Sequence, residues 1–311
     1  MSEGRMAVMN PQSELGEFLR LRRAGVQPED VGLLHHGVRR VPGLRREELA
    51  MLAGVSLTYY TRLEQGQSTN ASDAVLGSLA RALGLSADER SHLFDLARPP
   101  KKPSRRKPSR PETARPGTIR LVQAMTGVPA VVLGRLGDVL AWNPLGHRLV
   151  AAHLDVDSPQ SPQTRPNLHR LLFLDPETRE LYAQWPEEAA RAVASLRLLA
   201  GRAADDGALA ALVGELTLRS EEFARLWARH PVQNCVSGVK QFRHPEVGDL
   251  ELCFEVLDSP DGSGHRVLLY TAEPGGPAEE SLKLLGILAD SGGDGDAASG
   301  VRPGSAARPA V

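Results

Sequence analysis

Apolar residues recur every three to four positions between Ser13 and Arg98, the spacing of amphipathic helices. Glycine, proline and polar residues break this pattern into short segments. Residues 25–43 are too polar and too rich in Gly and Pro for a long helix, so we expect an inserted basic loop there. The pattern predicts five helices, near residues 13–24, 45–53, 57–65, 73–83 and 87–97.

The pattern stops after Ala97, where the chain reads RPPKKPSRRKPSRPETARPG. Repeated proline prevents a helix, and the near absence of apolar side chains prevents a core. We therefore expect residues 1–98 to form one all-α domain and residues 99–116 to form a basic linker.

Beyond the linker, the chain alternates between β-rich and helical patterns. Two β-rich runs around a glycine turn predict a hairpin at 130–143, and strands return at 239–272. Residues 291–311 are of low complexity and are expected to be disordered. Helices are expected near 144–153, 167–182, 186–204, 207–218, 220–229 and 278–289. Residues 117–290 are therefore expected to form an α/β domain, which makes the protein multidomain.

Charge is distributed unevenly along the 311 residues, although the net charge is only -1. Residues 1–98 carry a net charge of 0, residues 99–116 of +6, and residues 117–311 of -7. A basic segment next to a neutral helical domain is typical of a linker that follows DNA. Only two cysteines occur and no long apolar segment, so we expect a cytoplasmic, nucleoid-associated protein with no disulfide framework and no membrane contact.

The segment LRREELAMLAGVSLTYYTRLEQG, residues 44–66, has the pattern of a helix-turn-helix. This motif needs a small residue where the helices cross, a turn residue that tolerates positive φ, and an apolar anchor on the second helix. Ala50, Gly54 and Tyr60 meet these needs, and Ser56 is a suitable N-cap.

If Tyr60 and Leu63 face inward, the opposite face of the second helix is free to enter the major groove of DNA. Arg62 is expected to contact guanine, and Leu57 or Thr58 a thymine methyl group. Two arginines at the start of the preceding helix are placed for phosphates. The predicted DNA-binding residues are Arg45, Arg46, Ser56, Leu57, Thr58, Tyr59, Thr61 and Arg62.

Residues 13–97, including RLEQG and SDAVLGSLARALGL, resemble the XRE-type (Cro/repressor) helix-turn-helix family. The resemblance implies a five-helix DNA-binding domain that works as a homodimer on a palindromic operator in double-stranded DNA. The basic insertion at residues 35–46 departs from the minimal pattern of that family.

A second resemblance covers the α/β segment, through GVPAVVLGRLGDVLAWNPLGHRLV, NLHRLLFLDP, VGELTLRSEEFARLWARHPV, KQFRHPEVGDLELCFEVL and LLYTAEPG. These motifs are similar to the MmyB-like ligand-binding domain, which accompanies an XRE-type helix-turn-helix in that family. The resemblance implies a PAS-like sheet and a small hydrophobic effector, such as a fatty acid.

Large apolar side chains and polar residues at these motifs are candidates for binding an effector. A carboxylate head group would need a cation or an amide donor, for which Arg243 and His244 are further candidates. Each apolar side chain, taken alone, is more simply explained as part of a solid core. The predicted ligand-binding residues are Trp142, Asn143, Arg148, Phe173, Trp227, His230, Phe254 and Tyr270.

Catalytic motifs are weak in this sequence. Ser237-Gly-Val-Lys240 spells SxxK but leads into a strand pattern and lacks partner motifs, so chance explains it better. His35-His36 lies in the basic loop without further ligands at metal spacing. We expect no enzyme activity, no metal and no cofactor. Two alternatives stay open: a C-terminal domain that docks a protein partner and binds no small molecule, and an enzyme with a DNA-binding domain attached.

Overall fold

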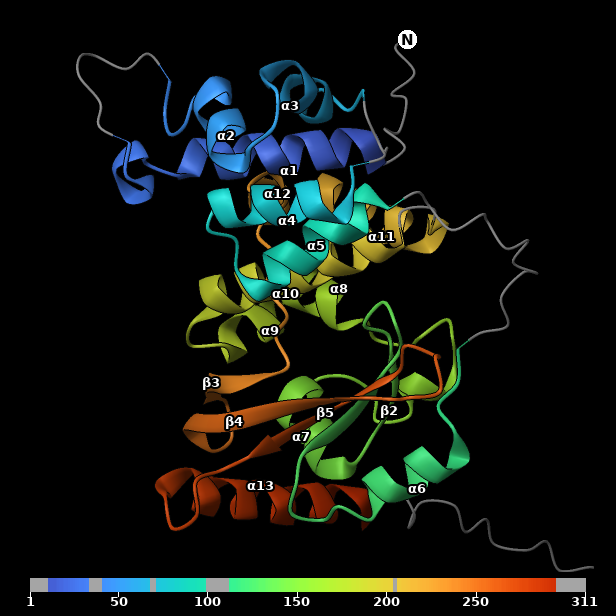
Figure 1. Ribbon diagram of the computed structural model, residues 1–311. Helices are drawn as coiled ribbons and strands as arrows, with labels where there is room; N and C mark the ends of the chain where they lie inside the picture. The colour runs from blue at the N-terminus through green and yellow to red at the C-terminus, as the bar shows by residue number, and fades with distance from the viewer. Residues whose placement is uncertain (1–10, 34–40, 68–70, 99–111, 204–205, 295–311) are drawn as a thin grey trace, which may run out of the picture. The chain divides into compact units, whose positions relative to one another are not determined.

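The computed structural model describes residues 11–33, 41–67, 71–98, 112–203 and 206–294 (Figure 1). Contacts divide the chain into two compact units, and each has its own apolar core. Unit 1 comprises Met1–Arg110, Leu172–Asp175 and Trp185–Cys235. Unit 2 comprises Pro111–Leu171, Pro176–Gln184 and Val236–Val311.

Unit 1 begins with the five helices that the apolar pattern predicts. They are α1 (Pro11–Gly25), α2 (Arg46–Ala53), α3 (Leu57–Glu64), α4 (Asp73–Ala82) and α5 (Ala87–Ala97). Serine side chains cap α3, α4 and α5 by accepting a hydrogen bond from a backbone N–H one turn into each helix. The expected loop between α1 and α2 contains a short 3-10 helix, η1 (Pro28–Val31), and its residues 34–40 lie outside the described residues.

Three further helices belong to unit 1: α10 (Trp185–Arg202), α11 (Gly207–Arg219) and α12 (Glu221–Ala228). We call these helices, together with residues 229–235, the helical block. Aromatic rings hold it together, because Phe173 packs edge-on against Trp185 and Phe223 at 5.9 and 5.1 Å between centroids. The contacts group the helical block with the five N-terminal helices, although its sequence lies within the predicted domain of residues 117–290.

Unit 2 is built on a five-stranded antiparallel sheet of order β2-β1-β5-β4-β3. The expected hairpin is present, with Val131 opposite Trp142 and a bulge between Val132 and Leu133. This sheet, together with the helices around it, confirms the expected PAS-like α/β fold beside an all-α domain. The strands are β1 (Ala130–Leu133), β2 (Val139–Trp142), β3 (Ser237–His244), β4 (Gly248–Asp258) and β5 (Arg266–Thr271).

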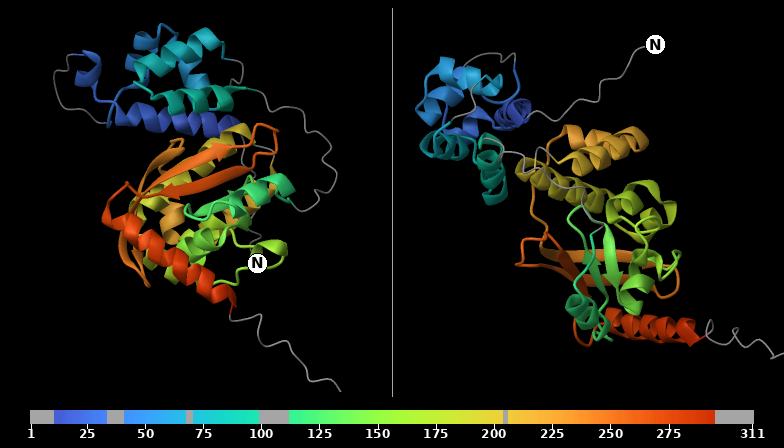
Figure 2. Two further views of the ribbon diagram at one scale, coloured as in Figure 1. Left: turned by 90° about the horizontal axis from the view of Figure 1, so that it is seen from below. Right: turned by 90° about the vertical axis from the view of Figure 1, so that its right-hand side faces the viewer.

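Helices cover both faces of this sheet. The main core lies on one face, where Leu149 of α7 (Pro144–Ala151) and Leu285 of α13 (Pro277–Asp294) pack with residues of the strands. Figure 2 shows α13, in red, lying along the sheet. Val122 of α6 (Pro116–Gln123) packs with β1 and β2 residues in a second cluster on the other face. None of the helices in the described residues is long and apolar enough to cross a membrane.

Three elements differ from the sequence prediction. The helix expected at 167–182 is two helices, α8 (Leu168–Leu174) and α9 (Pro176–Leu181), because Pro176 lacks an N–H and disfavours helical geometry at the residue before it. Helix α6 was not predicted, and its Pro116 occupies the first turn, where proline is tolerated. Helix α13 continues to Asp294, into the predicted tail, whereas linker residues 99–111 and tail residues 295–311 lie outside the described residues.

Candidate DNA-binding surface and ligand-binding domain

The turn between α2 and α3 has the predicted geometry. Gly54 ends α2 in the left-handed conformation, with φ of 68°, and the N–H of Val55 donates to the carbonyl of Ala50. The Ser56 hydroxyl then caps α3 by accepting from the N–H of Tyr59 at 3.1 Å. These local contacts set the angle between the two helices.

Helix α3 has one buried face and one exposed face. Tyr60 and Leu63 are fully buried, as predicted. Leu57 is 46% exposed, Thr58 and Arg62 are also exposed, and Tyr59 and Thr61 are half-buried. The exposed face therefore presents side chains that can reach base edges, whereas their contact with DNA stays a prediction.

A buried carboxylate that we did not predict organises this motif. The Glu64 side chain is only 1% exposed and accepts from Nε and Nη2 of Arg23 at 2.9 and 3.0 Å. Arg46 also donates to it, from Nε at 2.9 Å. Burial raises the pKa of Glu64, but the hydrogen bonds from Arg23 and the other partners outweigh it, so its net pKa is lowered. Glu64 therefore ties α1 and α2 to the end of α3 as an ionised group.

Arg45 and Arg46, the predicted phosphate contacts, are exposed at the start of α2. The N–H of Arg45 donates to the Glu48 carboxylate at 2.6 Å, which closes the first turn of the helix. The Arg46 side chain stays 46% exposed while it contacts Glu64. Its guanidinium is therefore held in position near the positive end of the helix dipole.

The eight predicted ligand-binding residues are divided between the two units. Phe173, Trp227 and His230 belong to unit 1, and the others belong to unit 2. Phe254 and Tyr270 are buried in the main core of unit 2. The structure therefore does not gather the eight residues within one unit.

The polar members of this set already have partners. The buried Asn143 side chain accepts from the N–H groups of Ala130 and Gly146, and it donates to the carbonyls of Met125 and Val128 at 2.7 Å each. Because four hydrogen bonds occupy its amide, Asn143 ties α7 to β1. The indole N–H of Trp142 likewise donates to the Val156 carbonyl at 2.8 Å.

Arg148 lies at a hollow of unit 2 but is also paired. Its guanidinium donates to both carboxylate oxygens of Glu246, at 2.8 and 2.5 Å, and the hydrogen bond raises its pKa. The hollow has a volume of about 170 Å³ and is lined also by His153, Arg243 and His244. It is smaller than the roughly 300 Å³ of ordinary ligand cavities.

A larger hollow of about 450 Å³ lies beside strand β3 in unit 2. Ala183, Gln241 and Phe242 line it, together with residues of β4 and the start of α13. Three of its lining residues are acidic: Asp249, Glu251 and Glu273. None of the eight predicted residues is among those that line this hollow.

The structure also describes the SxxK motif and the two cysteines. Ser237 and Lys240 lie on strand β3, so SxxK does not place them on one face of a helix. Cys235 and Cys253 form no disulfide among the described residues. Among the described residues, no group of three His, Cys, Asp or Glu side chains is placed to hold a metal ion.

Family models match both halves of the chain. A model described as a helix-turn-helix domain matches residues 14–93, and the MmyB-like transcription regulator ligand binding domain matches residues 114–285, more than half of the chain. A comparison with curated proteins finds no match. Both models describe parts of transcription regulators. The chain belongs to the family of XRE-type helix-turn-helix regulators that carry a C-terminal MmyB-like ligand-binding domain.

Proposed function

We propose that this protein is a cytoplasmic, sequence-specific transcriptional regulator that binds an operator as a homodimer and responds to a small hydrophobic effector of the fatty-acid class. The exposed face of α3 carries the DNA-binding part of the proposal. Leu57, Thr58 and Arg62 are free on this face, while the opposite face is anchored by Tyr60 and Leu63.

Each exposed residue of this surface has a role in the proposal. Arg62 reads guanine through a bidentate contact, and Leu57 or Thr58 contacts a thymine methyl group. Arg45 and Arg46 bind phosphates and position the protein without reading sequence. In a homodimer, the two α3 helices reach successive major grooves about 34 Å apart.

The effector part of the proposal rests on the family of the C-terminal domain and on energetics. Burying a chain of about ten methylenes contributes roughly 8 kcal/mol, at about 0.8 kcal/mol for each. Association costs about 4 kcal/mol or more, so at most about 4 kcal/mol remains, which corresponds to millimolar affinity. Tighter binding of a fatty acid therefore needs a longer chain or polar contacts to its carboxylate. Within unit 2, Trp142, Phe254 and Tyr270 supply the apolar surface in this proposal.

Binding-site selection with purified variants tests the DNA-binding part. Arg62→Ala is expected to relax sequence preference at one position, at a cost of about 1 to 3 kcal/mol in discrimination. Arg46→Ala is expected to weaken binding to all sequences alike. Arg219→Ala on α11 removes an exposed arginine outside the DNA-binding helices and serves as the control. An unchanged preference in Arg62→Ala would refute the base contact.

A further inference from the structure

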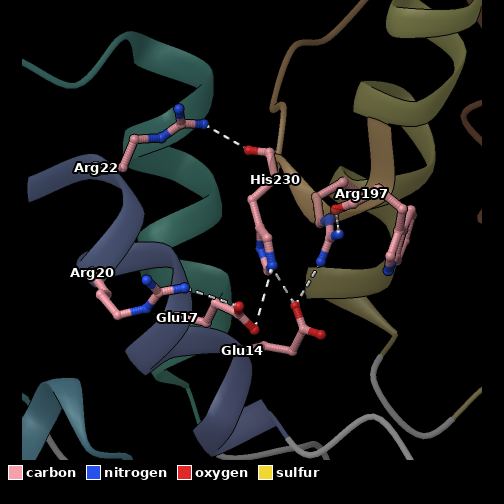
Figure 3. Close-up of polar contacts among 7 residues, drawn as sticks. Glu14, Glu17, Arg20, Arg22, Arg197 and His230 are labelled. Carbon is pink, nitrogen blue, oxygen red and sulfur yellow. Dashed lines mark hydrogen bonds and ion pairs between the residues drawn. The ribbon is translucent and has the colours of Figure 1, made fainter. Parts of the chain in front are cut away.

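The helical block contacts α1, as Figure 3 shows, and it also contacts α5. Arg197 of α10 donates to Glu14 of α1 at 2.7 Å, and Arg202 to Asp95 of α5 at 3.2 Å. The backbone N–H of Asn234 donates to Asp88 of α5 at 2.9 Å. Hydrogen bonds at Arg197, Arg202 and Asn234 therefore join the helical block to the DNA-binding helices.

Arg197 is the centre of this contact. Its side chain is 1% exposed, its guanidinium lies 3.7 Å from the centroid of the Trp227 ring, and it also donates to the Trp227 carbonyl. Burial lowers the pKa of Arg197 and raises that of Glu14, while their mutual attraction opposes both shifts. Since removing one member would leave the other buried and unpaired, the two charges hold the surfaces together.

Close packing surrounds this ion pair. Gly201 of α10 lies so near His92 of α5 that a Cβ on Gly201 would be 2.6 Å from the His92 ring. Val232 packs against the core of the DNA-binding helices, and Arg22 of α1 donates to the His230 carbonyl at 2.8 Å. A glycine is thus required at this point of α10 for the two surfaces to meet.

The contact also contains costly features. His230 has a positive φ of 50°, which is strained for a residue with a side chain. Both ring nitrogens of the buried His92 lack a hydrogen-bond partner among the described residues, as does Nε of Arg197. Buried polar atoms without partners each cost about 1 to 3 kcal/mol. These costs offset part of the gain from Arg197.

The contact leaves the DNA-binding face free. Its hydrogen bonds end on α1 and α5, whereas Leu57, Thr58 and Arg62 of α3 are exposed. Docking of the helical block is therefore compatible with DNA binding by α3.

Both ends of the helical block connect to strand β3 of unit 2. Just before the block, Tyr182 forms a bridge with Phe242, and the N–H of Ala183 donates to the Gln241 carbonyl at 2.9 Å. The block ends at Cys235, and β3 begins at Ser237. The chain therefore enters the block directly after residues bonded to β3 and leaves it directly before β3 begins.

We infer that residues 185–235 are an internal docking partner for α1 and α5, and that this contact, centred on Arg197 and Glu14, carries the effector signal to the DNA-binding helices. The signalling part rests on the proposed function. A Pro-rich linker such as 99–116 transmits force poorly, whereas packed helices with two arrangements can couple distant sites.

Gly201→Ala in the full-length chain tests the docking. The substitution favours helix α10 itself but introduces a Cβ against His92. Gly214→Ala is the matched control, because a Cβ there on α11 meets nothing within 4 Å. Hydrogen exchange of α1 and α5 amides is expected to rise about tenfold in Gly201→Ala and to stay unchanged in Gly214→Ala. Equal exchange in wild type and Gly201→Ala would overturn the docking.

The signalling part is tested with operator affinity measured with and without myristic acid. In wild type and Gly214→Ala, the operator affinities with and without myristic acid are expected to differ by about 5- to 150-fold. In Gly201→Ala and Arg197→Met, the same two affinities are expected to differ by less than about twofold. Retention of the full difference in both variants would overturn the signalling role. If wild type itself does not respond to myristic acid, the effector proposal fails, whereas the hydrogen-exchange result still decides the docking.

Discussion

Replacing Glu64 with glutamine removes the charge that ties α1 and α2 to the end of α3. The Glu64 side chain is 1% exposed and that of Arg23 is 11% exposed, so this pair is buried. Arg46 is 46% exposed, and its share of the interaction is small because water screens it. Breaking a buried pair from one side costs about 3 to 5 kcal/mol. Arg23 keeps its 2.7 Å hydrogen bond to the Leu44 carbonyl, so we expect a loss of about 3 kcal/mol.

The assay must report on the DNA-binding helices α1 to α5. Tryptophan fluorescence does not, because none of the three tryptophans, at positions 142, 185 and 227, lies in these helices. Hydrogen exchange of α1 and α3 amides in the full-length chain is suitable. Glu47→Gln is the control, since that carboxylate is 62% exposed and forms only a 3.4 Å contact with Arg45.

Glu64 also makes the stability of the DNA-binding helices fall at low pH. The pKa of Glu64 is lowered in the folded chain, so its stabilisation is present above the ordinary value of 4.5 and is lost as the pH falls below it. Exchange of α1 and α3 amides that is equal in wild type and Glu64→Gln would show that this carboxylate does not hold the motif together.

Two further predictions follow from buried polar groups. Burial, with Arg197 and Arg22 nearby, lowers the pKa of His92 to about 3, so the unfolded chain binds the proton more readily and stability falls as the pH drops below about 6.5. His92→Leu is expected to remove about 1 kcal/mol of the stability difference between pH 7 and 5.5, measured by urea unfolding, and an unchanged difference would contradict this. Asn143→Ala is expected to destabilise unit 2 by about 2 to 4 kcal/mol, because it removes a helix cap and leaves backbone groups without partners. Hydrogen exchange of β1 and α7 amides in the full-length chain measures this loss, and a change under about 0.5 kcal/mol would show that water replaces the amide.

The helix-turn-helix could be predicted because its signals are local. Gly54, Ser56 and Tyr60 act within a few residues of their positions, through a left-handed turn, a cap and an inward anchor. The position of Glu64 is also a local signal, since it lies four residues after Tyr60 on the same inward face. A carboxylate on a buried face indicates an ion pair.

The contact of the helical block with α1 could not be predicted from local signals. Its helices were predicted from periodicity, but Arg197 contacts Glu14 across most of the chain, and nothing in the spacing of either residue indicates this. His230 was predicted to bind the effector's head group, whereas its carbonyl accepts from Arg22 and its ring lies 3.8 Å from Glu14. Non-local contacts of this kind depend on tertiary packing, which periodicity does not encode.

In the proposed function, the C-terminal domain senses an effector and alters the affinity of the protein for DNA. By linkage, operator DNA must then change effector affinity by the same factor. Calorimetric titration of myristic acid into the full-length protein, with and without the operator obtained by binding-site selection, measures both affinities. We expect the two effector affinities to differ by about 5- to 150-fold. Identical affinities in the two titrations would contradict it.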